Sequence, residues 1–296
     1  MPQGELFARL LHVENAYRER ANRDNELLRY FPIAVVGCIE SFYRLAIKAL
    51  VDSVEPYLTN AKALFTNIKT GFEVLQAMHG QTITVGDLVA HSLKISNLSH
   101  VSSHMDQLLG DGYLKNLGSV RDRWKVEVHG APDQPILDDS DETFRWVSRA
   151  FELRHIFCYE LATNHDVEPS DIESAFEHSL LFLKASEELV SETLYPNAPL
   201  TQLDMNVTSG KEYREERAKL DGLLADLAAR VSGKQATKIE EANAAWEAYF
   251  EAAVEAEGLT YEGGSIRPMI QNLAAARLVR DRAKQVTELI ESITLP

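Results

Sequence analysis

The sequence predicts an all-α fold. Apolar residues recur at spacings of three and four along most of the 296 residues, which is the period of an α-helix. The alternation of apolar and polar residues that is typical of strands is not convincing anywhere, and no tandem repeat is present. Proline, glycine and capping residues stand where the apolar runs begin and end. The composition, 45% hydrophobic and 25% charged, fits a globular chain of one large or two medium domains.

The first helices follow directly from this periodicity. Residues 3–29 are expected to form a mostly polar helix with Leu6, Leu10 and Val13 on one side. Pro32 is expected in the first turn of a second helix, which is apolar nearly all round and therefore central. Shorter helices are expected over residues 57–117, one of them beginning after Thr84.

The middle of the chain contains the next two helices. Residues 118–140 are expected to be irregular, because Gly130, Pro132 and Pro135 interrupt them. The acidic run DDSDE at 138–142 is expected to cap a helix over 141–163, since carboxylates favour the positive end of a helix. A further helix is expected over 168–194.

The C-terminal part is expected to be a separate domain. Pro196, Pro199 and the stretch NVTSG predict a linker over 196–210. The helices expected after it span 211–232, 235–257 and 267–292, with Gly258 ending the second and Gly263-Gly264-Ser265 forming the next turn. The predicted domains are therefore 1–195 and 211–296.

The charge is strongly acidic and unevenly distributed. Lys and Arg total 30 against 45 Asp and Glu, so the net charge is −15 with neutral histidines. A chain this acidic has no global field for nucleic acid or anionic lipid, and any RNA contact must come from a local cluster. Residues 1–200 hold 18 basic and 29 acidic residues and all nine histidines, whereas the rest hold 12 and 16. This difference also places a boundary near residue 200.

The cysteines and the N-terminal segment predict a cytoplasmic protein. Cys38 and Cys158 are far apart and flanked by apolar residues, so we expect reduced core residues rather than a disulfide. Glu5 and Arg9 interrupt the first residues, which have no apolar core of signal-peptide length. The most apolar run, residues 31–39, is far too short to span a membrane, and no membrane contact is expected.

An arginine interrupts the apolar face of the helix expected at 141–163. Residues 144, 147, 151, 158 and 161 follow the spacing of that face, and the same spacing assigns position 154 to it, which is Arg154. An unpaired buried guanidinium is costly, so Arg154 should pair with an acid, face a second subunit or bind a ligand. His155 is adjacent, and Tyr159 shares a face with His155. An arginine can hold a phosphate while a histidine moves a proton.

The segment FELRHIFCYELA at 151–162, preceded by FPIAVVGCIESFYR, resembles the HEPN superfamily. Its members are helical bundles, and many are dimeric, metal-independent ribonucleases of toxin–antitoxin and phage-defence systems. Their motif is an arginine, four to six residues and a histidine, presented across a dimer cleft. The resemblance covers residues 1–195 and implies a homodimer that acts on RNA without a metal or a cofactor.

The sequence departs from that motif at one position. After four intervening residues, the family's histidine is replaced by Tyr159. A second register, from Arg149 to His155, has the right spacing, but these positions lie about 120° apart on a helix. Two alternatives stay open. In one, Arg154 holds the scissile phosphate, His155 is the general acid and base, and Tyr159 orients His155 or the substrate. In the other, the chain is a non-catalytic helical module that docks a partner protein.

Two other groups of residues on predicted helices have competing interpretations. Glu40 could pair with Arg154, although Glu40, Arg44 and Lys48 recur every four residues, which favours a solvated stripe. Glu40 and Arg149 are the candidate RNA- or partner-binding residues. His100 and His104 form an HxxxH pattern, but no glutamate follows the first histidine, and we expect no metal site.

The last ninety residues are similar to the small helical domain of LprI-type lysozyme inhibitors. The residues that carry this resemblance are Asp221, Ala242, Asn243, Trp246, Tyr249, Gly263, Gly264, Ser265 and Arg282. Exported members carry disulfides, whereas here Val254 and Ala274 stand roughly at the cysteine positions. The resemblance therefore implies that the helical scaffold is kept without disulfides in a reducing cytoplasm, and it does not imply lysozyme inhibition. Trp246 and Tyr249 are expected to pack in the core. A basic cluster could take an acidic partner: Arg277, Arg280, Arg282 and Lys284.

Overall fold

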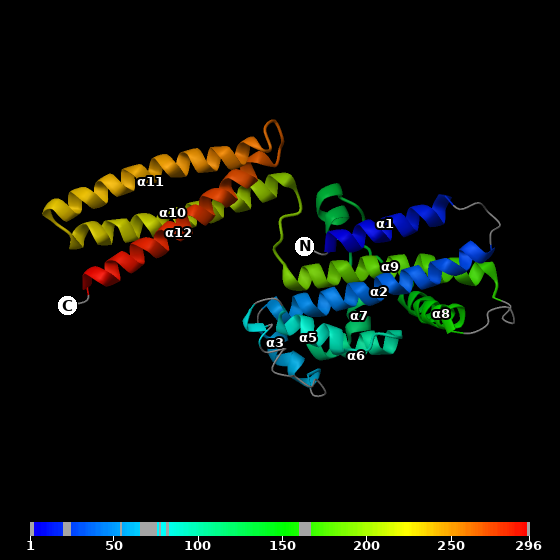
Figure 1. Cartoon of the computed structure of the whole chain (residues 1–296). Helices are drawn as coiled ribbons and strands as arrows, with labels where there is room; N and C mark the ends of the chain where they lie inside the picture. The colour runs from blue at the N-terminus through cyan, green and yellow to red at the C-terminus, as the bar shows by residue number, and fades with distance from the viewer. Residues whose placement is uncertain are drawn as a thin grey trace. The chain divides into compact units, whose positions relative to one another are not determined.

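The computed structural model describes residues 3–19, 25–53, 55–65, 76, 78–80, 83–159 and 167–294. Within these residues every regular element is helical, and the β contacts are confined to one isolated bridge between Arg121 and Pro135. The predicted all-α class is confirmed. The chain divides into two compact units, Met1–Asn197 and Ala198–Pro296 (Figure 1).

The first unit is organised around α2 (Asn25–Ser53). This helix packs against α1 (Gln3–Glu19), α5 (Val85–Ser92), α8 (Ser140–Tyr159) and α9 (Pro169–Leu194) (Figure 1). Its side chains are buried on most sides, as the apolar sequence predicts: Phe31, Val35, Val36, Ile39, Phe42, Tyr43, Ile47 and Leu50. The remaining elements are short: α3 (Tyr57–Asn60), η1 (Ala61–Ala63), α6 (Leu98–Leu109), α7 (Tyr113–Gly118) and η2 (Trp124–Val128).

The boundary between the first two helices differs from the expectation. The single helix predicted over 3–29 is wrong, because α1 ends at Glu19 and α2 already begins at Asn25. Pro32 is therefore inside α2 rather than in its first turn. Proline has no N–H to donate to the preceding turn, which weakens a helix interior. Pro32 and its neighbour Phe31 are nevertheless buried, so tertiary packing outweighs the local preference.

Two predicted helix starts are confirmed by capping bonds. The Thr84 hydroxyl accepts from the backbone N–H of Asp87 at 3.1 Å, and the Asp87 carboxylate accepts from the backbone N–H of Thr84 at 2.9 Å. This reciprocal pair begins α5. At the start of α8, the Asp139 carboxylate accepts from the backbone N–H of Glu142 at 2.8 Å. The acidic run at 138–142 therefore caps α8 as predicted.

The segment predicted to be irregular, 118–140, is held by specific contacts. It contains η2, a five-residue π-helical turn at Trp124–Val128. Arg123 is buried and donates from Nε to Glu188 on α9 at 2.5 Å. Asp122 pairs with Lys184 on α9 at 2.9 Å. These side-chain contacts hold the segment against α9.

The second unit consists of three long helices. α12 (Arg267–Thr294) packs along α10 (Gln202–Arg230) and against α11 (Gly233–Leu259). The linker predicted over 196–210 is too long and the helix start predicted at 211 is wrong, because α10 begins at Gln202. The reason is a capping box, in which Thr201 and Asp204 satisfy each other's backbone N–H groups. The turn before α12 is as predicted, with Gly263 at a φ of +75°.

The core of the second unit is small and includes one of the two predicted aromatic residues. Its buried members are Leu220, Leu227, Phe250, Ala275, Val279 and Val286. Trp246 is half-buried and stacks on Phe250, with ring centroids 5.3 Å apart. Tyr249 is 59% exposed, so its predicted place in the core is wrong. Among the described residues, no helix has both the length and the hydrophobicity needed to span a bilayer.

Candidate functional site

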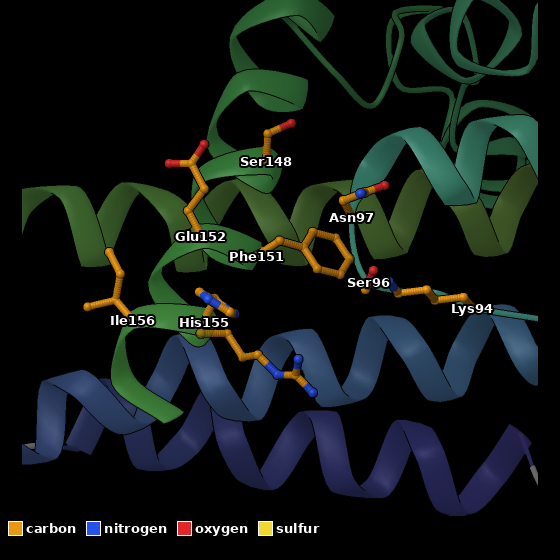
Figure 2. A pocket seen from close by; sticks show the side chains of 9 residues that line it. Lys94, Ser96, Asn97, Ser148, Phe151, Glu152, His155 and Ile156 are labelled. Carbon is orange, nitrogen blue, oxygen red and sulfur yellow. The ribbon is translucent and has the colours of Figure 1, made fainter. Parts of the chain in front are cut away.

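A pocket of about 650 Å³ lies between α8 and the segment that leads into α6 (Figure 2). The residues that line it are Lys94, Ser96, Asn97, Ser148, Phe151, Glu152, Arg154, His155 and Ile156. In Figure 2 the Phe151 ring points from α8 toward Ser96 and Asn97 on the opposite wall. Since α6 begins at Leu98, the N-terminus of a twelve-residue helix borders the pocket. A helix N-terminus carries partial positive charge.

Local hydrogen bonds hold the wall formed by Lys94, Ser96 and Asn97. Asn97 caps α6, because its side-chain oxygen accepts from the backbone N–H of His100 at 2.8 Å. The Ser96 hydroxyl lies 3.1 Å from Nδ1 of His100, and Nε2 of His104 lies 3.0 Å from the carbonyl oxygen of Lys94. The two histidines of the HxxxH pattern therefore support this wall.

The protonation of His100 is consistent with this supporting role. Burial lowers the pKa of His100, and the electrostatic influence of the neighbouring Lys94 and His104 lowers it further. The His100 and His104 rings stack with centroids 6.2 Å apart. In the part of the chain that the structure describes, no group of three or more His, Cys, Asp or Glu side chains could hold a metal ion.

Arg154 lies at the edge of the buried face of α8. The residues that fill this face are Val147, Ala150, Phe151 and Leu153. The NH2 group of Arg154 lies 3.5 Å from Oε1 of Glu40 on α2, and each side chain is 26% exposed. The guanidinium also lies over the Tyr159 ring, 5.8 Å from its centroid. Of the three expected environments for Arg154, the structure shows a pair with an acid, at the border of the pocket.

The stripe of Glu40, Arg44 and Lys48 on α2 is not solvated as expected. Glu40 contacts Arg154, as described above. Arg44 donates from NH1 to the carbonyl oxygen of Ala90 on α5 at 2.6 Å. Lys48 pairs with Asp87 on α5 at 2.5 Å. Each residue therefore reaches a neighbouring helix, because α2 is covered by α5 and α8 along this side.

His155 and Tyr159 are both exposed and share a face of α8, as the sequence predicts. Their ring centroids are 5.3 Å apart at an interplanar angle of 46°. Tyr159 is 68% exposed. Cys158 between them is also exposed, so its predicted burial is wrong, whereas Cys38 is buried as predicted. The face that packs on the core continues through Leu153 and the partly buried Phe157 rather than through positions 154 and 158, and the predicted position 161 lies outside the described residues.

Arg149 belongs to a different environment from Arg154. Its NH1 group pairs with Glu152 at 3.0 Å, and its NH2 group lies 3.6 Å from Asp171 on α9. Arg149 does not line the pocket. The second register, Arg149 with His155, is therefore not brought together in the pocket. The angular separation of these two positions on a helix accounts for this result.

The pocket concentrates hydrogen-bond donors in an acidic chain. Lys94, Arg154 and His155 supply cationic or protonatable nitrogens, and Ser96 and Asn97 add a hydroxyl and an amide. Glu152 is the acidic residue of the lining and is paired with Arg149. Such a set of donors is suited to a phosphate or another oxyanion. Sequence reasoning missed Lys94, Ser96 and Asn97; an asparagine just before an apolar helix was the available signal.

In the second unit, three residues of the predicted resemblance come together. Arg282 donates from NH2 to Oδ1 of Asn243 at 2.6 Å, and its guanidinium lies over the Trp246 ring, 5.8 Å from the centroid. Nε of Arg282 is buried without a hydrogen-bond partner among the described residues. This cluster joins α12 to α11. The sequence identified its members but not their contact.

Arg217 links α10 to α11 in a second polar cluster. It donates two hydrogen bonds to Glu247, at 3.0 and 2.6 Å, and one to Asp221 at 2.9 Å. The hydrogen bonds to Glu247 and the nearby carboxylates raise the pKa of Arg217, so it stays charged. Asp221, the first residue of the predicted resemblance, therefore contacts Arg217 on its own helix. The sequence did not single out Arg217 or Glu247.

In the predicted basic cluster on α12, Arg277, Arg280 and Lys284 are exposed and form surface ion pairs. Arg277 pairs with Glu257 on α11, and Arg280 pairs with Glu212 on α10 at 3.2 Å. Lys284 pairs with Asp281 at 3.5 Å. These exposed pairs fit a solvated helix face, and the acidic partner stays a prediction.

The family comparison concerns the second unit. The family model described as lysozyme inhibitor LprI matches residues 196–286, which confirms the resemblance of this part of the chain. The chain is also similar to an uncharacterized protein of Rhizobium meliloti (strain 1021), with 29% identity over 107 residues. That alignment covers 31% of this chain and 76% of the relative. No solved structure matches the chain.

Proposed function

We propose that the first unit binds RNA at the pocket between α6 and α8 and cleaves it without a metal ion. The observation that carries this proposal is the convergence of Arg154, His155 and Lys94 on one pocket at a helix N-terminus. In a chain of net charge −15, such a local set of donors is what an RNA phosphate requires. The resemblance of residues 151–162 to the HEPN superfamily supports the same reading and suggests a role in defence or toxin–antitoxin systems.

The chemistry needs only groups of the protein and of RNA. Arg154 holds the scissile phosphate, and neutral His155 takes the proton of the adjacent 2′-hydroxyl. The 2′-oxygen then bonds to phosphorus while the bond from phosphorus to the 5′-oxygen breaks. The leaving 5′-oxygen receives a proton from the protonated His155 of a second copy of the chain. Tyr159 orients His155 through the ring contact, and the reaction implies a homodimer.

Glu40 has a definite part in this proposal. Its carboxylate occupies Arg154 in the free protein, and an incoming phosphate competes with it for the guanidinium. A phosphate offers two oxygens to the planar guanidinium, whereas Glu40 lies 3.5 Å from a single nitrogen. Arg149 is held by Glu152 and Asp171 outside the pocket lining, so a contact of Arg149 with RNA is not part of this proposal.

The test is RNA degradation by the purified full chain in the presence of EDTA. Arg154→Ala and His155→Ala are each expected to abolish cleavage while the melting temperature stays close to that of the wild type. The matched control is Arg145→Ala, which removes an equal charge from an exposed position of α8 outside the pocket. The proposal fails if both pocket variants degrade RNA like the wild type, or if the wild type degrades none.

A second candidate function is a non-catalytic helical module that docks a partner protein. The pair between Arg154 and Glu40 favours it, because it gives the arginine a structural task of joining α8 to α2. In this case Arg154→Ala lowers stability by up to about 1 kcal/mol and the wild type cleaves no RNA. The same degradation assay and a melting curve separate the two functions.

For the second unit we propose a protein partner. Its supporting observation is the match to a family named for the inhibition of another protein. The unit contains no cysteine, which fits the reducing cytoplasm where we place the chain. A pull-down with the full chain and with the Trp246→Ala variant tests this proposal, since a partner that docks on the α11–α12 cluster should be captured by the wild type alone.

A further inference from the structure

Tyr159 places an exposed aromatic ring beside Arg154 and His155, two residues that line the pocket. It is the last described residue of α8, and 68% of it is exposed. The ring lies 5.3 Å from that of His155, and the Arg154 guanidinium lies 5.8 Å from its centroid. The ring is thus held by two polar neighbours that also line the pocket, while most of its surface faces solvent.

From this placement we propose that the site takes single-stranded RNA, with one unstacked nucleobase lying on the Tyr159 ring while the adjoining phosphate is held by Arg154. The inference rests on the proposed function and adds the substrate class and a positioning residue to it. Tyr159 stands where a histidine would be expected from the resemblance, and this proposal gives the tyrosine a task of its own.

The physical argument is that every nucleobase presents a flat π-face. Proteins that bind single strands use exposed aromatic rings as platforms for such faces, close to positive groups that hold the backbone. Arg154 and Lys94 provide the positive groups here, and Tyr159 provides the ring. The tyrosine hydroxyl is not needed for stacking, so phenylalanine should substitute for it.

The same argument excludes duplex RNA as the preferred substrate. In an A-form duplex each base is stacked on its neighbours and paired, so its face is covered. A ring on the protein surface reaches such a face only in loops, bulges or ends. The pocket is therefore expected to discriminate by strandedness rather than by base identity, since stacking tolerates every base.

The experiment is a fluorescence anisotropy titration of the full chain with a short labelled RNA whose 2′-hydroxyls are methylated. Methylation removes the nucleophile, so binding is measured without cleavage. Tyr159→Ala is expected to weaken binding by roughly tenfold, whereas Tyr159→Phe retains most of the affinity. The loss caused by Tyr159→Ala should disappear on an oligonucleotide with abasic sites, and the duplex form should bind more weakly than the single strand.

The outcomes separate this inference from the proposed function. If Arg154→Ala weakens binding but Tyr159→Ala does not, RNA binds in the pocket and the stacking role is wrong. If Tyr159→Phe binds as weakly as Tyr159→Ala, the hydroxyl acts and not the ring, which also overturns the inference. If the wild type does not bind the oligonucleotide, or binds it no better than Arg154→Ala, the proposed function fails and the inference fails with it.

Discussion

Three hydroxyl groups meet inside the core of the first unit. The Tyr43 hydroxyl lies 2.7 Å from the Tyr113 hydroxyl and 2.7 Å from Oγ of Ser186. These residues come from α2, α7 and α9, and all three are fully buried. Burial raises the pKa of Tyr113 to about 12 and that of Tyr43 well above its ordinary value, so both stay neutral at physiological pH.

Tyr43→Phe is expected to destabilise the first unit by about 1–3 kcal/mol. The substitution keeps the ring but removes two hydrogen bonds, and each buried bond contributes about 0.5–1.5 kcal/mol net. Tyr113→Phe removes the bond to Tyr43 and should cost about 1 kcal/mol. In the double variant this shared bond is lost once, so its cost should fall short of the sum by about 1 kcal/mol.

Urea unfolding followed by tryptophan fluorescence measures these changes. The chain has three tryptophans, and in a Trp246→Phe background the remaining two, Trp124 and Trp146, report on the first unit. The reasoning is refuted if the free energy of unfolding of Tyr43→Phe lies within about 0.5 kcal/mol of that of its parent. This result would show that the hydroxyl network contributes little to stability.

Three further predictions concern helix contacts and charge. Gly86→Ala should destabilise by about 1–3 kcal/mol, since the added Cβ would lie 2.6 Å from a backbone oxygen of α2. Its control is Gly37→Ala, with nothing within 4 Å of the added carbon, which should stabilise by up to about 1 kcal/mol in the same urea assay. Burial raises the pKa of Asp87, but its hydrogen bonds lower it to about 2, so stability present above pH ~4 should be lost as the pH falls toward 2. Asp87→Asn should remove this pH dependence of the free energy of unfolding and should cost about 1 kcal/mol at neutral pH. An unchanged pH dependence in acid unfolding contradicts this account. Arg217→Lys should destabilise the second unit by about 0.5–1 kcal/mol, because lysine cannot make the paired bonds to Glu247, and unfolding followed through this unit's single tryptophan checks it.

The helices and several of their starts could be predicted because their signals are local. Thr84 and the acidic run before α8 satisfy nearby backbone N–H groups, so three or four residues suffice to identify the start. Pro32 shows where local reasoning fails, since its burial in the core of the first unit overrides its preference for a first turn. The start of α10 at Gln202 was missed, although Thr201 and Asp204 carry a capping pattern in the sequence.

The candidate site could be predicted only in part, because its two walls are distant in the sequence. Arg154, His155 and Tyr159 lie on one helix, and helical spacing relates them directly. Lys94 and Asn97 face them across the pocket through the packing of the first unit, which no spacing in the sequence encodes. The contact between Arg154 and Glu40 likewise depends on how α8 lies on α2, and the sequence left it as one of two alternatives.

The most direct test of the central claim compares RNA affinities of the wild type, Arg154→Ala and Glu40→Gln in one anisotropy titration with the methylated oligonucleotide. If Arg154 is the phosphate ligand and Glu40 competes for it, Arg154→Ala should weaken binding and Glu40→Gln should tighten it, because the carboxylate no longer holds the guanidinium. Equal affinities for all three proteins, with lower melting temperatures for both variants, would show that the pair is purely structural and would contradict the account.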